Sequence, residues 1–132
     1  MPDRFETSTT LAARPKEVYR AWLDSRAHAA FVGSTAEIDP RVGGTFEIFD
    51  GYIKGSNLSL EPPRRIVQAW RTTEFPEGSP DSRLEILVAA EGARTRLTLV
   101  HTDTPDGQGP RYAAGWEEHY LTPMREYFAR RR

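Results

Sequence analysis

The sequence predicts one α+β domain over residues 1–132, in which a curved antiparallel sheet of six to seven strands wraps around a long C-terminal helix. Three observations carry this prediction. Between residues 36 and 103, apolar and polar residues alternate and turn signals recur at short intervals, as in antiparallel strands. From residue 110 onward, large apolar side chains recur at helical spacing instead. Two short segments follow the first strand and predict two short helices, the first of them amphipathic.

The N-terminal region is predicted to form one strand and two helices. Residues 5–11 alternate and are rich in β-branched side chains, which is typical of a strand. Pro15 suits the first turn of a helix, and the apolar spacing continues this helix to Leu23. Ser25 is expected to cap a second short helix, which ends at Gly33.

The remaining strands are predicted from period-two patterning at residues 36–39, 45–49, 52–60, 64–75, 84–90 and 95–103. Asp50-Gly51 predicts a two-residue hairpin turn, because this pair adopts positive φ readily. Gly55 is expected to mark a β-bulge in the returning strand. Pro62-Pro63 predicts the turn that leads into the longest strand.

The last helix is predicted over residues 110–130, on an apolar stripe formed by Ala113, Trp116, Tyr120, Met124, Tyr127 and Phe128. Pro123 lies inside this helix and removes one backbone hydrogen bond, so a kink is expected near it. Residues 130–132 are three arginines, which are expected to form the solvated end of the helix.

Composition argues against several classes of function. The net charge is −1, so the sequence lacks the basic character on which nucleic-acid binding rests. Cysteine is absent and the three histidines have no metal-binding spacing, so neither a metal nor another cofactor is expected. No apolar stretch approaches the roughly 20 residues of a membrane span. The polar N-terminus, without an apolar signal region, predicts a cytoplasmic location.

Several motifs resemble a known superfamily. Residues 36–39 (AEID) and 42–51 (VGGTFEIFDG) resemble a hallmark of the SRPBCC, or START-like, superfamily. Residues 62–71 (PPRRIVQAWR), 75–78 (FPEG) and Gly115-Trp116 are similar to its AHSA-type family, that of the activator of the ninety-kilodalton heat-shock-protein ATPase. The resemblance covers about residues 28–130, and the two N-terminal helices fit the superfamily.

The resemblance implies a helix-grip fold with a deep cavity under the long helix. Eukaryotic members of the family are two-domain co-chaperones, and this chain resembles their C-terminal domain alone. The superfamily at large binds lipids, hormones and polyketides, and some of its members are cyclases or hydrolases.

Inward-facing positions of the strands and of the last helix provide the candidate ligand-binding residues: Phe46, Ile48, Gln68, Trp70, Leu97, Leu99, His101, Trp116, Tyr120 and Met124. These side chains either line a cavity or fill the core, and the sequence leaves both readings open. Gln68 shares the parity of Trp70, so it is either a polar handle for a ligand or a satisfied core residue. His101, with Asp103 or Glu118 nearby, is either a general base or a hydrogen-bonded residue at a sheet edge.

The sequence therefore favours a non-catalytic domain that binds a small hydrophobic ligand between the sheet and the last helix. No catalytic residue is assigned. The alternative is a co-chaperone-like domain that binds a protein partner through its surface. A third reading is a cavity-based enzyme of the hydrolase or cyclase type. Trp70 and Trp116 are expected to sense a bound ligand, and Trp22 is expected to respond less.

Overall fold

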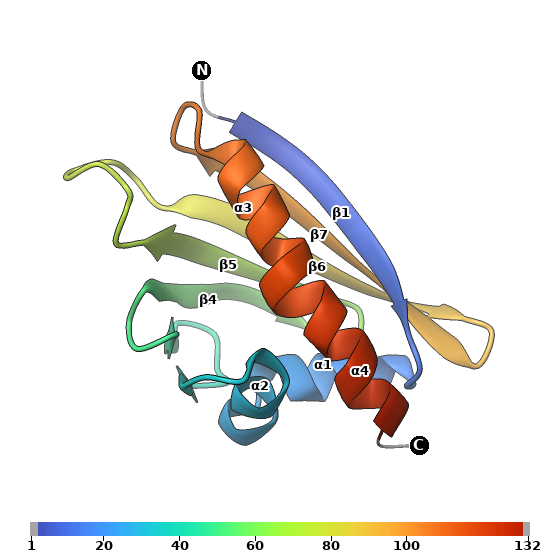
Figure 1. Cartoon of the computed structure of the whole chain (residues 1–132). Coiled ribbons are helices and arrows are strands. Elements are labelled where there is room, and N and C mark those ends of the chain that lie inside the picture. The colour runs from blue at the N-terminus through green and yellow to red at the C-terminus, as the bar shows by residue number, and fades with distance from the viewer. Residues whose placement is uncertain (1–2, 131–132) are drawn as a thin grey trace.

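The computed structural model describes residues 3–130 and contains a seven-stranded antiparallel sheet in the order β1-β7-β6-β5-β4-β3-β2. A long C-terminal helix lies across one face of this sheet, and two short helices lie near its far end (Figure 1). The strands are β1 (Asp3–Leu11), β2 (Ala36–Ile38), β3 (Thr45–Ile48), β4 (Ile53–Glu61), β5 (Arg65–Thr72), β6 (Ser82–Glu91) and β7 (Arg94–Thr104). The predicted α+β class, the strand number and the helix across the sheet are confirmed.

The strands alternate because one face of the sheet is covered by the long helix and the other faces solvent. On β7, Leu97, Leu99 and His101 are fully buried, whereas the residues between them are partly exposed. The first strand of the chain pairs with the last one, so Thr9 lies opposite Leu97 across β1 and β7. This long-range pairing brings the N-terminal strand beneath the C-terminal helix.

Two predicted details of the β3–β4 hairpin are wrong. The connection is a four-residue loop, since Ile48 pairs with Ile53, and Phe49 and Asp50 both take a φ of 56°. The register shift of β4 lies between Asn57 and Ser59, not at Gly55. Gly55 is needed for close approach instead, because a Cβ there would lie 1.9 Å from the carbonyl oxygen of Ala69 on β5.

The short helices are α1 (Pro15–Leu23) and α2 (Ser25–Val32). Asp24, not Ser25, caps α2, because its carboxylate accepts the backbone N–H of Ala27 at 2.8 Å. The hydroxyl of Ser25 instead exchanges hydrogen bonds with the backbone of Ile38, which ties α2 to β2. The predicted end at Gly33 is confirmed, with a φ of 69°.

The C-terminal helix runs without a break from Gly109 to Arg130, in three segments: α3 (Gly109–Gly115), the π-helical η1 (Trp116–Leu121) and α4 (Thr122–Arg130). In η1 the N–H of Thr122 donates to the carbonyl of Glu117, five residues earlier. This wide turn directly precedes Pro123, which has no N–H to continue the α-helical pattern. The irregularity therefore lies at residues 116–121, and residues 131–132 of the arginine run lie outside the described residues.

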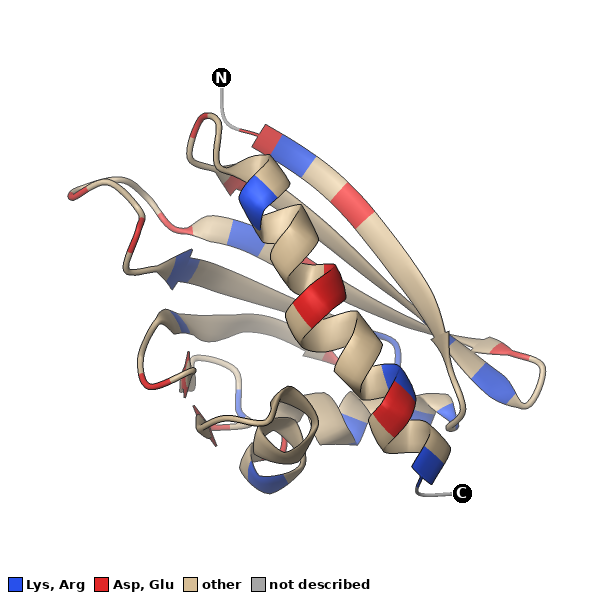
Figure 2. Ribbon diagram, viewed as in Figure 1, with Lys and Arg blue, Asp and Glu red and all other residues tan. Residues whose placement is uncertain are grey.

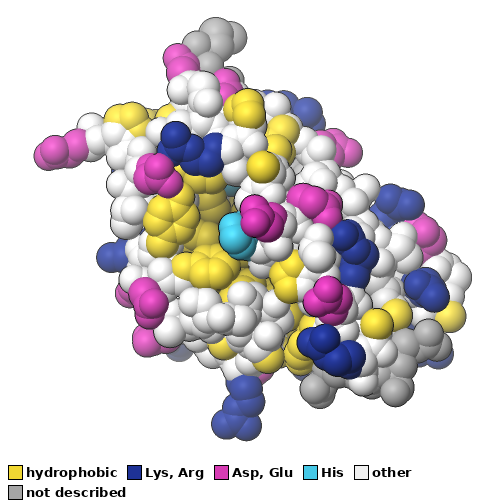
Figure 3. Space-filling view, in the orientation of Figure 1, with side chains coloured by type: hydrophobic (Ala, Val, Ile, Leu, Met, Phe, Trp, Pro, Cys, Tyr) yellow, Lys and Arg dark blue, Asp and Glu magenta, His cyan; other side chains and the backbone are white. Residues whose placement is uncertain are grey.

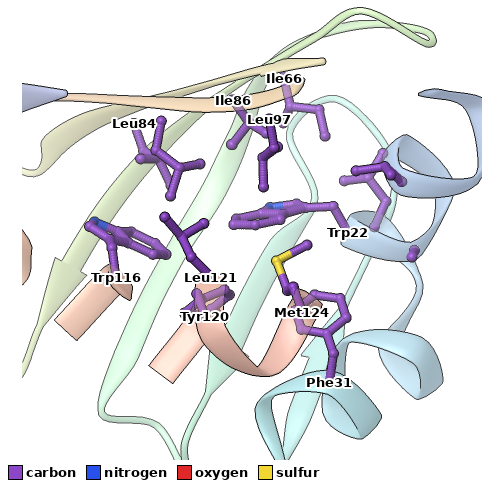
Figure 4. Packing of buried hydrophobic residues seen from close by; sticks show 14 of the residues in the cluster. Trp22, Phe31, Ile66, Leu84, Ile86, Leu97, Trp116, Tyr120, Leu121 and Met124 are labelled. Carbon is purple, nitrogen blue, oxygen red and sulfur yellow. The ribbon is translucent and has the colours of Figure 1, made fainter. Parts of the chain in front are cut away.

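A continuous hydrophobic core lies where the second half of the long helix meets the sheet. Figure 4 shows Leu121 and Met124 pointing toward the sheet, within a cluster that also contains Trp22, Phe31, Ile66, Leu84, Ile86 and Leu97. Both helix residues are fully buried. Because Tyr120 and Leu121 are consecutive and both buried, the π turn brings an additional large side chain onto the inner face of the helix.

Lys and Arg are interspersed with Asp and Glu along the described ribbon, without a large region of one sign (Figure 2). Ion pairs cross the outer face of the sheet, for example from Arg65 to Glu85 and from Arg71 to Asp81. Among the helices of residues 3–130, none has both the length and the apolar character that crossing a membrane demands.

Candidate functional site

A cavity of about 630 Å³ lies between the first half of the long helix and strands β4 and β5. It is lined by Phe49, Tyr52, Ile53, Trp70, Glu74, Arg111, Tyr112, Gly115, Trp116, His119 and Tyr120. Figure 3 shows apolar side chains gathered in a hollow beside the helix, with charged and histidine side chains around it. This volume falls in the range of small-molecule sites, and its lining is mainly apolar.

Aromatic rings form most of the cavity wall. The ring centroid of Trp70 lies 5.5 Å from that of Trp116 and 5.1 Å from that of Tyr112. Trp116 in turn lies 4.6 Å from Tyr120. All four residues are at least nine-tenths buried, so their rings are held by packing. The wall therefore offers flat, preformed apolar surface to a ligand.

Two backbone features border the cavity. Gly115 lies on the long helix at the cavity wall, and a Cβ built there would meet no atom within 4 Å. On the opposite wall, Phe49 occupies the left-handed region of φ, which bulky residues rarely adopt. Its ring lies 6.1 Å from that of His119 and closes one side of the mouth. The void thus borders a helix position without a side chain on one wall and the β3–β4 loop on the other.

The end of the cavity near the start of α3 is polar and is organised by a closed circuit of hydrogen bonds. The N–H of Glu74 donates to Thr72 Oγ1 at 3.1 Å. Tyr112 donates its hydroxyl to Gln108 Oε1 at 2.7 Å, so Thr72 Oγ1 must donate to the Tyr112 oxygen, also at 2.7 Å. Gln108 Nε2 closes the circuit on the carbonyl of Glu74 at 3.0 Å. This circuit fixes the Glu74 backbone against the helix.

The carboxylate of Glu74 is displayed at the mouth with two partners. Arg111 Nη1 donates to Glu74 Oε1 at 2.5 Å, and the hydroxyl of Tyr52 donates to Glu74 Oε2. Burial and this hydrogen bond to Glu74 raise the pKa of Tyr52 to about 12, so its hydroxyl stays protonated at neutral pH. One end of the apolar cavity therefore carries a carboxylate, a guanidinium and a phenol.

His101 lies behind the cavity wall as a satisfied core residue. Trp116 Nε1 donates to its Nδ1 at 3.0 Å, so the ring proton sits on Nε2 and is donated to Ser82 Oγ at 2.8 Å. Ser82 Oγ donates in turn to the carbonyl of Trp70 at 2.7 Å. Burial lowers the pKa of His101 to about 3, which keeps the ring neutral. Both nitrogens are occupied by hydrogen bonds, but His101 lies on β7, between β1 and β6, and not at the sheet edge that the sequence suggested.

A second buried histidine, His28 on α2, holds the next aromatic residue of the long helix. Its Nδ1–H donates to the carbonyl of Trp22 at 2.8 Å, and its Nε2 accepts the hydroxyl of Tyr120 at 2.7 Å. Burial lowers the pKa of His28 to about 4. Trp116 and Tyr120 are thus each held by one neutral histidine. Sequence reasoning missed His28, although its position on an amphipathic helix indicated burial.

The predicted binding residues fall into three groups. Trp70, Trp116 and Tyr120 border the large cavity. Phe46, Ile48 and Gln68 border a void of about 10 Å³ behind it, where Gln68 Nε2 donates to Asn57 Oδ1. The remaining four, Leu97, Leu99, His101 and Met124, are fully buried in the packed core.

Trp22 also borders the small void, and its ring lies 6.2 Å from that of Trp116. It therefore belongs to the same aromatic cluster. Sequence reasoning missed the polar end, because it placed Glu74 inside the strand predicted over residues 64–75, whereas β5 ends at Thr72 and Glu74 lies in the loop after it. Tyr112 had a usable signal, since it precedes Trp116 by one helical turn. Within residues 3–130, no group of three His, Asp or Glu side chains is placed to hold a metal ion.

A curved antiparallel sheet that grips one long helix over an aromatic cavity defines a helix-grip domain of the SRPBCC type. Solved structures agree with this class. An HSP90 activator from Plasmodium falciparum, PFC0360w, is 26% identical with a TM-score of 0.83, over 90% of this chain and 91% of that one. CalU16 from Micromonospora echinospora is 28% identical with a TM-score of 0.80, over 96% of this chain and 76% of that one.

Residues 12–129 match the family described as activator of Hsp90 ATPase homolog 1-like protein, and the chain belongs to this family. It is 26% identical to the human activator of 90 kDa heat shock protein ATPase homolog 1, over 90% of this chain. The corresponding Dictyostelium discoideum protein is 26% identical over 97% of this chain. The match spans only 35% of the length of each of these relatives.

Proposed function

We propose that this chain is a non-catalytic binding domain that holds a small, mainly apolar ligand between its sheet and its long helix. The observation that carries the proposal is the aromatic cavity of about 630 Å³. Its rings are buried and fixed by hydrogen bonds behind the wall, as those of Trp116 to His101 and Tyr120 to His28. A preformed apolar site binds without the entropic cost of ordering its own side chains.

A ligand can also fill the cavity without disturbing the packing around it. Gly115 has open space in front of it, so a ligand can occupy this region without displacing a packed side chain. The hydrogen-bonded end around Glu74 supports a fixed orientation, because a few placed polar groups in an apolar site determine how a ligand lies. In residues 3–130 both buried histidines use their ring nitrogens for structural hydrogen bonds, which supports binding over catalysis.

The test is a fluorescence titration with the neutral naphthalene dye prodan. We expect saturable binding to the wild type, with a blue shift of dye emission and quenching of tryptophan fluorescence. Gly115→Leu projects a side chain into the cavity and should weaken binding by about tenfold or more, which corresponds to about 1.4 kcal/mol. Ala114→Leu, on the exposed side of the same turn, is the matched control and should bind like the wild type. Equal binding by the Gly115 variant would place the dye elsewhere.

The second candidate function is a co-chaperone-like domain that binds a protein partner. The family match and the relatives named as heat-shock-protein ATPase activators favour it. A pull-down with purified 90 kDa heat-shock protein tests this directly. Retention of the chaperone by both the wild type and Gly115→Leu would support a surface role that does not use the cavity.

A further inference from the structure

We infer that the Glu74–Arg111 pair selects ligands without net charge, so that the cavity takes a planar aromatic molecule with a neutral, hydrogen-bonding head group. This inference rests on the proposed function, because it specifies which ligand the same cavity holds. It is carried by the position of the pair, which lies at one end of a site whose other walls are mainly aromatic or apolar, with His119 at the mouth beside Glu118.

The body of the ligand follows from the walls. The ring centroid of Trp70 lies 5.1 Å from that of Tyr112 and 5.5 Å from that of Trp116, and all three rings border the cavity. Aromatic partners gain from offset or edge-to-face contacts beyond the area that they bury. A flat aromatic body matches such walls better than a flexible chain, which would lose more conformational freedom on binding.

The head group follows from the charges. Arg111 Nη1 lies 2.5 Å from Glu74 Oε1, so the two formal charges at this end cancel each other. Their side chains are 51% and 44% exposed, which leaves both accessible from the cavity mouth. A neutral head can donate to Glu74 and accept from Arg111 without separating the pair. A carboxylate is repelled by Glu74 and an ammonium is repelled by Arg111, whereas a neutral head group meets no like charge at either residue.

The geometry holds the pair in place for this purpose. The hydrogen-bond circuit through Thr72, Tyr112 and Gln108 fixes the backbone of Glu74, and Tyr52 binds the second carboxylate oxygen. A guanidinium offers five N–H donors, and the bond to Glu74 uses its Nη1. Arg111 therefore has donors for a ligand carbonyl while it stays bound to Glu74.

The experiment uses four probes with one naphthalene body, in competition with prodan at pH 7.5. They are naphthalene, 2-naphthamide, 2-naphthoate and 2-naphthylmethylammonium. In the wild type we expect 2-naphthamide to bind about fivefold more tightly than either ion, because each ion meets one like charge at the half-exposed pair.

Neutralising one member of the pair at a time should change this selectivity, in favour of the anion in one variant and of the cation in the other. Glu74→Gln leaves Arg111 available and should improve 2-naphthoate about tenfold, through a charge-assisted contact. Arg111→Gln leaves Glu74 available and should improve 2-naphthylmethylammonium by a similar factor. Glu77→Gln changes the same unit of charge in the same exposed loop and is the control, with the wild-type ranking expected.

The outcomes separate the two proposals. If naphthalene binds the wild type but the ranking of the four probes is the same in all variants, the charge selection is wrong and the cavity proposal stands. If no probe binds the wild type, both fail. Opposite shifts for the two ions in Glu74→Gln and Arg111→Gln are the result expected here, and a parallel shift for both ions would overturn the inference.

Discussion

The two halves of the long helix pack on the same sheet in different ways. In the second half, Leu121 and Met124 reach the sheet and are fully buried in a continuous core. In the first half, Tyr112 and Trp116 are also buried, yet they border a cavity of about 630 Å³. One apolar stripe along one helix thus produces a filled region and a hollow one.

The difference lies in side-chain shape and in the glycine between the rings. Unbranched or branched aliphatic chains adapt to the sheet, and Met124 in particular can fill irregular gaps. The rigid rings of Tyr112 and Trp116 cannot spread sideways into the space that Gly115 leaves. The hydrophobicity of the buried helix face therefore does not by itself decide whether that face forms packed core or borders a cavity. The positions of small residues along the helix matter as much.

The largest expected effect is a loss of stability in acid, which tests whether a neutral histidine fixes an aromatic ring of the helix in both halves. His101 accepts a hydrogen bond from Trp116, and His28 accepts one from Tyr120. Their pKa values in the folded chain are about 3 and about 4, below the ordinary value of 6.5. Between pH 6.5 and these lower values, each histidine binds more protons in the unfolded chain than in the folded one. The contribution of the neutral histidines to the free energy of unfolding is therefore complete above pH 6.5 and is lost as the pH falls toward 4. We expect a loss of about 3 kcal/mol per histidine, measured by urea unfolding at successive pH values.

His28→Gln provides the control for this acid response, because glutamine can form hydrogen bonds but does not titrate. Its free energy of unfolding should depend less steeply on pH between 6.5 and 4, because about one proton fewer is taken up on unfolding. A slope equal to that of the wild type would mean that His28 is not the titrating group. A wild type whose stability is constant across this range would contradict the role of both histidines.

The next effect separates the filled half from the hollow one directly. Met124→Ala should leave a cavity in the packed region and lower the free energy of unfolding by about 2–5 kcal/mol. A saturating probe should still raise the stability of the variant by the same increment as in the wild type, about 2.7 kcal/mol at a hundredfold excess over Kd. Thermal melts with and without prodan measure both quantities. Loss of the increment would mean that the two halves are not independent.

The sequence predicted the regular parts of this arrangement better than the site. Alternation was sufficient for β7, where Leu97 and Leu99 face the helix as expected, because burial on one face enforces a period of two. The same parity could not tell that these two residues lie under the filled half and away from the large cavity. That depends on where the helix crosses the sheet, which is a three-dimensional property.

Local competition explains the other differences. Asp24 and Ser25 are both good caps, and the choice was decided by Ile38, whose backbone occupies the Ser25 hydroxyl. Glu74 lies in a connecting loop, and only the folded chain brings it to Arg111, 37 residues later. Polar sites assembled from loops and helix starts leave little periodic trace in a sequence.

A smaller effect should sharpen the comparison at the boundary between the halves, where Tyr120 lies. Tyr120→Phe keeps the ring but removes the hydroxyl that donates to His28 Nε2, leaving a buried acceptor without a partner. We expect the free energy of unfolding to fall by about 1–3 kcal/mol. Urea unfolding at pH 7.5 measures this loss. An unchanged stability would indicate that water replaces the hydroxyl and that this part of the wall is wetter than the filled half.

The smallest expected effect concerns Gly115, the residue that distinguishes the hollow half. Its φ of −62° and ψ of −41° are helical, and a Cβ there would meet no atom within 4 Å. Gly115→Ala should therefore raise the free energy of unfolding by about 0.5–1 kcal/mol, because alanine restricts the unfolded chain and fits the helix without a clash. The reverse change at the exposed neighbour, Ala114→Gly, should lower it by a similar amount. If Gly115→Ala instead destabilises the chain while Ala114→Gly behaves as expected, side chains close over Gly115 in solution, and the hollow half is as filled as the other.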